Sequence, residues 1–209
     1  PNKLASASTH QDYNAKGVCP AALGTKDQQP AAYSPKTGLM YIPLNHVCMT
    51  YEPVESKYVA GQPWVGATLT MFAGPDGVMG GFTAWDPIKG KSVWYNKEKF
   101  SAWGGVLTTA SDLVFYGTLD RWFKAVDAQS GKELWKFQVG SGVIGNAFTY
   151  GNKGKQYVGV LSGIGGWAGV AMNLGMTNPT DALGAAGGYA ELTKYNAAPG
   201  GGALNVFSL

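Results

Sequence analysis

The feature that most restricts the fold of this chain is a short pattern that occurs twice, 41 positions apart. Residues 84–94 and 125–135 agree in register at an Ala, an Asp, a Gly, a Lys and a final Trp. In each copy an apolar stretch ends at the Asp, the Gly supplies the positive φ of a turn, and the Lys leads into a second strand. A period of about 40–45 residues is typical of a four-stranded propeller blade. The pattern predicts neighbouring blades of an all-β propeller, with Trp94 and Trp135 docked between blades.

Strand and turn residues alternate along much of the remaining chain. The other segments predicted to form strands are residues 32–43, 103–109, 113–118, 149–160 with a turn at 152–154, and 203–209. We interpret residues 50–80 and 165–200 as long connections. The length of 209 residues allows at most about five blades, and fewer once these connections are removed. An open arc of blades leaves edge strands unpaired, so we expect the chain to be incomplete or to be completed by another segment.

The composition agrees with a globular all-β chain. Gly accounts for 31 of 209 residues, beside 7 Trp and 11 Tyr, which suits short strands and tight turns. The net charge is +3 and the basic residues form no run, which argues against nucleic acid and against a membrane surface. We find neither the roughly 20 apolar residues of a membrane span nor the pattern of a signal peptide.

Three further features have more than one interpretation. Cys19 and Cys48 lie outside any zinc-site spacing, and on their own they are equally well two buried thiols or a disulfide. Residues 140–145 fit Gly-x-Gly-x-x-Gly, but a strand rather than a helix is predicted to follow, so we interpret them as a turn. His10 and His46 are remote from any nucleophile pattern, which argues against a hydrolase triad.

Beyond the repeat, the sequence resembles the methanol and ethanol dehydrogenases that depend on pyrroloquinoline quinone (PQQ). The matching stretches are residues 18–22, 24–33, 44–49, 60–62, 65–69, 100–105, 163–167 and 206–209. Members of that family are eight-bladed propellers, so the resemblance implies that residues 1–209 are the C-terminal portion of one propeller domain. It also implies a disulfide between Cys19 and Cys48, and with it an oxidising periplasm.

The resemblance assigns cofactor contacts to five residues. Trp103, Gly166 and Trp167 match residues that line the quinone, while Asp27, with Lys26 beside it, matches a polar residue that hydrogen-bonds the quinone. Judged without the family, the tryptophans are more often core residues, and Lys26-Asp27 is more often a solvated turn before Pro30. Glycine neighbours, which let a ligand approach the backbone closely, favour Trp103 and Trp167 over the docking pair.

The resemblance further implies the chemistry of the complete enzyme. PQQ needs aromatic or apolar walls, donors for its carboxylates and a cation at its reacting carbonyl. A primary alcohol loses a proton to a base and a hydride to the quinone, and electrons pass singly to a cytochrome c. The catalytic base and the metal ligands of the family precede the matched region, so we assign no catalytic and no metal residue to this segment.

Several points stay open within this interpretation. The variant Lys26-Asp27-Gln28-Gln29 looks more like lanthanide-dependent than calcium-dependent methanol dehydrogenases, which tend to carry His-Asn at the first two positions. A homodimer is expected, and a small second subunit remains an option. The alternative function is a cofactor-free propeller that binds other periplasmic proteins. The joint presence of Lys26-Asp27, Trp103 and Gly166-Trp167 argues against that scaffold.

Overall fold

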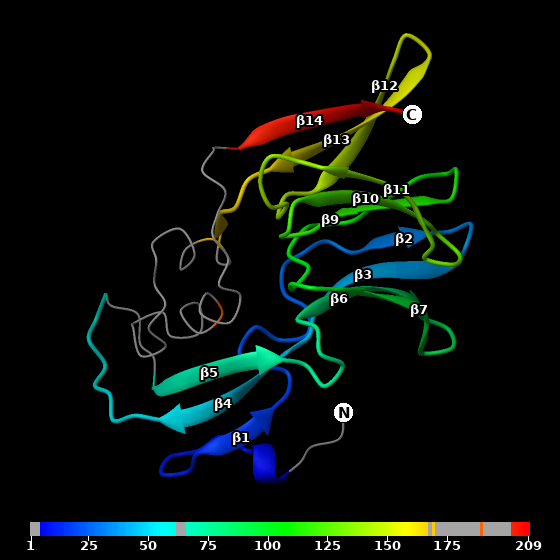
Figure 1. Cartoon of the computed structure of the whole chain (residues 1–209). Coiled ribbons are helices and arrows are strands. Elements are labelled where there is room, and N and C mark those ends of the chain that lie inside the picture. Colours follow the sequence, from blue (N-terminus) through cyan, green and yellow to red (C-terminus); the bar gives the residue numbers. More distant parts are fainter. Residues whose placement is uncertain (1–4, 62–65, 167–168, 170–188, 190–201) are drawn as a thin grey trace.

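The described part of the chain consists of short strands arranged in four sheets (Figure 1). A computed structural model describes residues 5–61, 66–166, 169, 189 and 202–209. The elements are η1 (Ala5–Ala7), β1 (Ala15–Val18), β2 (Ala32–Ser34), β3 (Leu39–Asn45), β4 (Val47–Pro53), β5 (Ala67–Ala73), β6 (Gly80–Asp86), β7 (Lys91–Glu98), β8 (Leu107–Thr108), β9 (Leu113–Gly117), β10 (Trp122–Asp127), β11 (Glu133–Gln138), β12 (Ala147–Asn152), β13 (Lys155–Ser162) and β14 (Ala203–Ser208). The predicted hairpins at 32–43 and 149–160 and the strand at 203–209 are confirmed.

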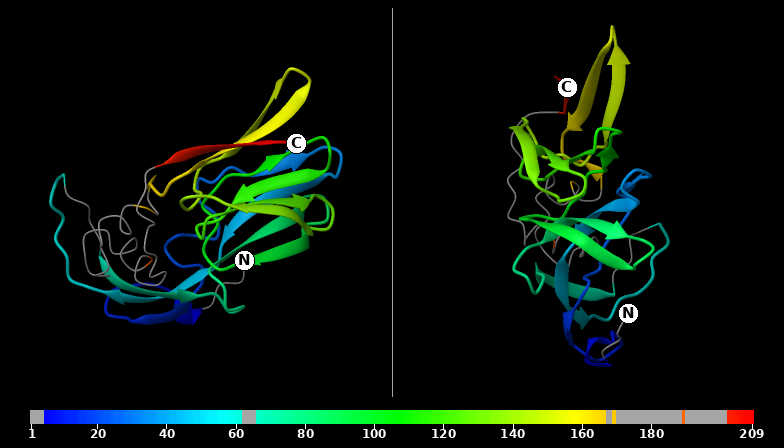
Figure 2. Two further views of the ribbon diagram at one scale, coloured as in Figure 1. Left: turned by 45° about the horizontal axis from the view of Figure 1, so that its top comes forward. Right: turned by 90° about the vertical axis from the view of Figure 1, so that its right-hand side faces the viewer.

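Three of the sheets are stacked face to face as blades (Figures 1 and 2). We call β2-β3-β6-β7 the first blade, β8-β9-β10-β11 the second and β12-β13-β14 the third; within each sheet the paired strands are antiparallel. The Phe82 and Tyr116 rings of the first and second blades are stacked with centroids 4.2 Å apart. Phe123 of the second blade stacks on Phe207 of the third at 5.8 Å. This arrangement is that of consecutive blades in a β-propeller, as the repeat predicted.

The inner strands β9 and β10 of the middle blade are largely buried. One apolar core fills the space between the first and second blades, and another fills the space between the second and third. The inner strands β6 and β9 therefore lack an alternation of buried and exposed residues and carry nearly continuous buried runs. By contrast, every residue of the outer strand β11 is exposed.

The two copies of the repeat form the same turn, and the Asp of each copy closes it. Asp86 Oδ1 accepts hydrogen bonds from the N–H groups of the second and third residues after it, at 3.0 and 2.9 Å. Asp127 Oδ1 does the same at 3.2 and 2.8 Å. Gly90 and Gly131 end the turns with φ of +62° and +71°. An Asp that caps its own turn, followed by a Gly in the left-handed region, explains why both residue types recur.

The tryptophans of the repeat dock on the following blade. Trp94 Nε1 of β7 donates to the Ala128 carbonyl in the turn of the second blade, at 3.1 Å. The Trp94 ring lies against Gly131, where a Cβ would come within 2.6 Å of it. Trp135 of β11 meets Phe207 of the third blade edge to face, at 4.9 Å between centroids. The predicted docking of both tryptophans between blades is confirmed.

The fourth sheet corrects one prediction. Residues 50–80 were expected to be a connection, but β4 and β5 pair along their whole lengths and join β1 in a three-stranded sheet. This hairpin is inserted between β3 and β6, which are neighbours in the first blade. The reason is amphipathicity, since residues of β5 alternate between buried and more exposed positions. Its buried side chains cover the ends of the blades near Trp103.

The third blade is incomplete within the described residues. It has three strands where the first and second blades have four, and β14 is paired on one side only. Its outward side chains are largely exposed, including Leu161 at 56% and Leu204 at 58%. None of the helices in the described part of the chain is long and apolar enough to cross a membrane.

Candidate functional site

Lys26 and Asp27 lie in an exposed loop, residues 24–30, that leads into β2. The Lys26 ammonium donates to the backbone carbonyl of Asp27 at 2.9 Å, and the Asp27 N–H donates to Gln29 Oε1 at 2.8 Å. Each of these bonds joins a side chain to the backbone of Asp27, and among the described residues the Asp27 carboxylate and two of the three Lys26 N–H donors remain available. This end of the loop can offer donors to an anionic ligand.

Trp103 lies in a second loop, residues 99–106, between β7 and β8. Its side chain is only 7% exposed and packs in the core beneath the β1-β4-β5 sheet. Its Nε1 donates to the hydroxyl of Tyr189 at 3.0 Å, and the two rings meet edge to face. Burial raises the pKa of Tyr189 to about 12, so this phenol is neutral at physiological pH. Because the indole N–H is already bonded, Trp103 can offer a ligand only its ring.

The two candidate loops lie side by side. Gln29 Nε2 donates to the Ala102 carbonyl at 2.9 Å, one residue before Trp103. The Val106 N–H donates to the Pro30 carbonyl at 3.2 Å. The structure therefore brings Asp27 and Trp103 onto adjacent loops, although they are far apart in the sequence.

Gly104 and Gly105, which follow Trp103, were expected to leave room for a ligand, but the structure gives another reason for the absence of a side chain there. A Cβ on Gly105 would lie 2.1 Å from Asn146 Oδ1 and 3.0 Å from Pro30 Cδ. A Cβ on Gly104 would lie 3.3–3.4 Å from three backbone carbonyl oxygens. The space beside both glycines is filled by the chain itself, so they permit close packing of loops.

The third predicted segment lies behind the same core. Gly166 has a φ of +56°, and among the described residues the atom nearest to the position of a Cβ there is Ile144 Cδ1, at 4.0 Å. Ile144 and Ile164 both pack against the core that contains Trp103. The predicted contact at Trp167 falls outside the described residues. Trp103 and Gly166 therefore lie next to the same apolar core. Asp27 is linked to the Trp103 loop by the hydrogen bonds of Gln29.

Sequence reasoning missed two buried amides in this region. Gln29 is 2% exposed and Asn45 is 1% exposed. The Gln29 Nε2 and Asn45 Oδ1 atoms are 3.5 Å apart, and Asn45 Nδ2 has no hydrogen-bond partner among the described residues. A Gln in a polar loop gives no sign of burial, so only the tertiary structure could reveal it. A buried donor without a partner is a place where a ligand or water would gain a hydrogen bond.

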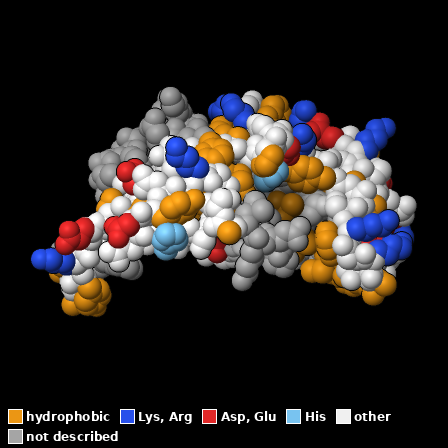
Figure 3. Space-filling view, turned by 90° about the horizontal axis from the view of Figure 1, so that it is seen from below, with side chains coloured by type: hydrophobic (Ala, Val, Ile, Leu, Met, Phe, Trp, Pro, Cys, Tyr) orange, Lys and Arg blue, Asp and Glu red, His pale blue; other side chains and the backbone are white. Residues whose placement is uncertain are grey.

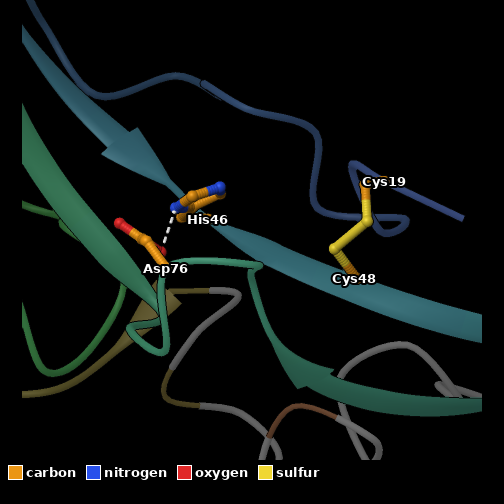
Figure 4. Close-up of a disulfide and its surroundings, with 4 residues drawn as sticks. All are labelled: Cys19, His46, Cys48 and Asp76. Atoms are coloured by element: carbon orange, nitrogen blue, oxygen red, sulfur yellow. Dashed lines mark ion pairs between the residues drawn. A yellow bond between two sulfur atoms is a disulfide. The ribbon is translucent and has the colours of Figure 1, made fainter. Parts of the chain in front are cut away.

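Figure 4 shows the disulfide between Cys19, after β1, and Cys48 of β4, which confirms the pairing that the resemblance implied. On the neighbouring stretch of chain, His46 Nδ1 lies 2.7 Å from Asp76 Oδ1 (Figure 4). The ring of His46 packs over Gly74, where a Cβ would come within 2.6 Å of it. His46 thus ties the β5–β6 connection to the start of β4.

Charged side chains are dispersed over the face seen in Figure 3, with Lys and Arg toward the end that carries the β6–β7 turn. Lys89 of that turn pairs with Asp86 at 3.2 Å.

Among the described residues, no three His, Cys, Asp or Glu side chains gather as metal ligands would.

Comparison with known proteins defines the class. A family model described as the β-propeller domain of PQQ-containing glucose, ethanol and alcohol dehydrogenases matches residues 80–158, which hold both copies of the repeat. This match agrees with the propeller arrangement of the first and second blades.

Longer matches place the chain within that class. It is 59% identical, over 100% of its length, to a lanthanide-dependent methanol dehydrogenase of Methylorubrum extorquens. It is 45% identical over 96% of its length to methanol dehydrogenase (cytochrome c) subunit 1 of Methylobacterium organophilum. A solved structure of a europium-containing methanol dehydrogenase superposes with a TM-score of 0.90 at 48% identity, over 99% of this chain and 37% of that one. The chain is similar to these dehydrogenases over nearly all of its own length, and it spans 35% and 33% of the two curated relatives.

Proposed function

We propose that the complete protein is a periplasmic, PQQ-dependent dehydrogenase of primary alcohols, methanol first, and that this chain is the C-terminal portion of its propeller domain. The observation that carries the proposal is the junction of the Asp27 loop with the Trp103 loop. Both loops match the family's quinone-contacting stretches in sequence, and the fold places them side by side. The relatives' names support the same substrate class.

The residues present fit a flat, anionic quinone in three respects. Lys26 has N–H donors that are free for carboxylates, and Asp27 is exposed beside it. Asn45 Nδ2, close to the same loop, is a buried donor that has no partner in the part of the chain that the structure describes. Trp103 supplies a rigid aromatic ring whose position is fixed by Tyr189. When bound, the quinone supplies the hydride acceptor; this chain's residues bind its edge and hold the wall of its pocket.

The wider setting belongs to the proposal as well. Electrons would leave to a cytochrome c, as they do in the relative that is a methanol dehydrogenase (cytochrome c) subunit 1, to judge by its name. The Cys19–Cys48 disulfide supports an oxidising compartment such as the periplasm. Lys26-Asp27 and the lanthanide-dependent relatives favour a lanthanide over calcium as the metal.

The complete protein provides the test. Purified without cofactor, it should gain the absorption of bound quinone and dye-linked methanol oxidation when PQQ and lanthanum are added, and less activity with calcium. The rival scaffold function predicts neither quinone binding nor alcohol-dependent dye reduction with any of these additions. If the complete protein showed no quinone binding, or no alcohol-dependent dye reduction, the proposed enzyme function would be refuted.

A matched pair of variants tests the role of Trp103. Trp103→Phe and Trp94→Phe each remove one indole hydrogen bond, of 3.0 and 3.1 Å. We expect Trp103→Phe to weaken quinone binding about tenfold, and Trp94→Phe to lower only the melting temperature, because Trp94 is a docking residue. Equal quinone affinities of the two variants would remove Trp103 from the site.

The same design tests Asp27. Asp27→Asn should weaken quinone retention, measured as quinone per protein after gel filtration. Glu55→Gln removes an equally exposed carboxylate outside the site and should leave retention unchanged. Retention equal to that of the unmodified protein in Asp27→Asn would argue against the assignment.

A further inference from the structure

Gln29 differs from its neighbours in the loop by being buried. Lys26, Asp27 and Gln28 are exposed, whereas the Gln29 side chain is 2% exposed. Burying an amide is unfavourable unless its donor and acceptor are both bonded. Here both are bonded, because Oε1 accepts the Asp27 N–H at 2.8 Å and Nε2 donates to the Ala102 carbonyl at 2.9 Å.

The two partners of this amide are the backbones of the two candidate loops. Asp27 is itself a candidate cofactor contact, and Ala102 is the residue directly before Trp103. The hydrogen bond to Ala102 spans 73 positions of sequence. One side chain therefore sets the distance between the backbone at Asp27 and the backbone next to Trp103.

The surrounding ties hold the loops but not this spacing. Val106 N–H to the Pro30 carbonyl and Asn45 N–H to the Thr25 carbonyl, at 3.2 and 2.7 Å, act on either side of Asp27. Neither touches Asp27. Without the Gln29 amide, Asp27 would keep its place in the chain but lose the bond that fixes its backbone relative to Trp103.

We propose that Gln29 is a positioning residue of the quinone site, which fixes Asp27 and Trp103 relative to each other through its two amide hydrogen bonds. This inference rests on the proposed function. Gln29 itself need not touch the quinone. Errors of about 1 Å in the placement of such groups can reduce rates about a hundredfold, so a residue that fixes the spacing has a measurable effect.

The test uses the complete protein, freed of quinone and titrated with PQQ at a fixed lanthanum concentration. Gln29→Leu retains the size of the side chain and removes both hydrogen bonds; Gln28→Leu makes the same exchange on the adjacent exposed residue. We expect the quinone Kd of Gln29→Leu to rise about tenfold, with a shift in the absorption of the bound quinone, and that of Gln28→Leu to be unchanged.

A second variant covers the case in which Gln29→Leu does not fold. Gln29→Glu preserves shape and the acceptor for Asp27 N–H, but an ionised carboxylate cannot donate to the Ala102 carbonyl. Protonation restores a donor. The quinone Kd of Gln29→Glu, relative to that of the unmodified protein at the same pH, should therefore fall about fivefold from pH 8 to pH 5. A glutamine with a merely structural role would not produce this response.

The outcomes are separable. Gln29 variants with a lowered melting temperature but with the Kd, spectrum and pH response of the unmodified protein would overturn the positioning role and leave the proposed function intact. Failure of the unmodified protein to bind quinone would overturn the proposed function and this inference with it.

Discussion

Asp86 and Asp127 show how one residue type determines a repeated turn. For Asp127, the hydrogen bonds from the Ser130 side chain and backbone hold the pKa of the carboxyl below its usual value. For Asp86, the backbone hydrogen bond from Lys89 is the main cause of the lowered pKa. A carboxylate with a lowered pKa stabilises the folded state above its unfolded pKa of about 3.9, and that stabilisation is lost as the pH falls through the folded value.

We therefore predict an acid-dependent loss of stability that depends on Asp127. Between pH 5 and pH 2.5 the melting temperature of the Asp127→Asn variant should fall by a few degrees less than that of the unmodified protein, because Asn has no proton to gain. At pH 7 the variant should be slightly less stable. Asp120→Asn, in another turn, is the control, measured by thermal unfolding followed by circular dichroism. Parallel curves for all three proteins would contradict the prediction.

At the scale of elements, the contact of Trp94 with Gly131 joins the first and second blades. Gly131 has φ of +71°, and a Cβ there would lie 2.6 Å from the Trp94 ring. Gly38, in the β2–β3 turn, has φ of +70°, and no atom lies within 4 Å of the position of its Cβ. The two glycines have the same backbone conformation but only one is covered by a ring.

This pair of glycines separates backbone strain from docking. Ala at either position costs about 1–2 kcal/mol because of the positive φ. Gly131→Ala should cost about 1–3 kcal/mol more, because the Trp94 ring must move. Urea unfolding of the complete protein measures the difference between the two variants. Equal losses of stability would show that docking on Gly131 contributes nothing.

A second contact between blades is electrostatic. Glu98 of β7 is 6% exposed, accepts a hydrogen bond from Tyr116 of β9 at 2.7 Å and pairs with Lys124 of β10 at 2.8 Å. Burial, with the negative charge of Glu98, raises the pKa of Tyr116, so the phenol stays a donor. A buried ion pair with its hydrogen bonds satisfied fixes how the two blades face each other.

For the whole molecule, the third blade is the open end. Within the described residues β14 is paired on one side, and Leu134, Trp135 and Phe137 of β11 are exposed. Four-stranded first and second blades indicate that the third blade needs one more strand. An unpaired, apolar edge is a template for pairing with another chain.

We predict that residues 1–209 produced alone self-associate, whereas the complete protein does not do so through this edge. Light scattering coupled to gel filtration should show concentration-dependent growth of the segment. Leu204→Lys places a charge on β14, where Leu204 is 58% exposed, and should reduce the growth. The control variant Ile88→Lys changes a turn residue that is 92% exposed, and it should not reduce the growth. A segment that stays monomeric at all concentrations would contradict this account.

The sequence alone predicted what depends on neighbouring residues. The Asp–Gly spacing fixes a turn, the Trp follows at a set distance, and the hairpins at 32–43 and 149–160 have their own turn residues. These are local consequences of backbone conformation. The β4–β5 hairpin was missed because it is an insertion between two neighbouring strands and lies outside the 41-residue repeat, although β5 alternates between buried and more exposed residues.

What only the tertiary structure decided is which distant residues meet. Gln29 stands in a polar loop, and its burial arises because the 99–106 loop folds over it. Gly104 and Gly105 are needed because Asn146 and backbone carbonyl oxygens fill the space where their side chains would lie. Glu98 pairs with Lys124 because the first and second blades are stacked. The sequence by itself thus determined the blade and its docking tryptophans, because a repeat is a local pattern. The alignment of the candidate site was decided by packing between blades, because it depends on contacts between loops that no local pattern records.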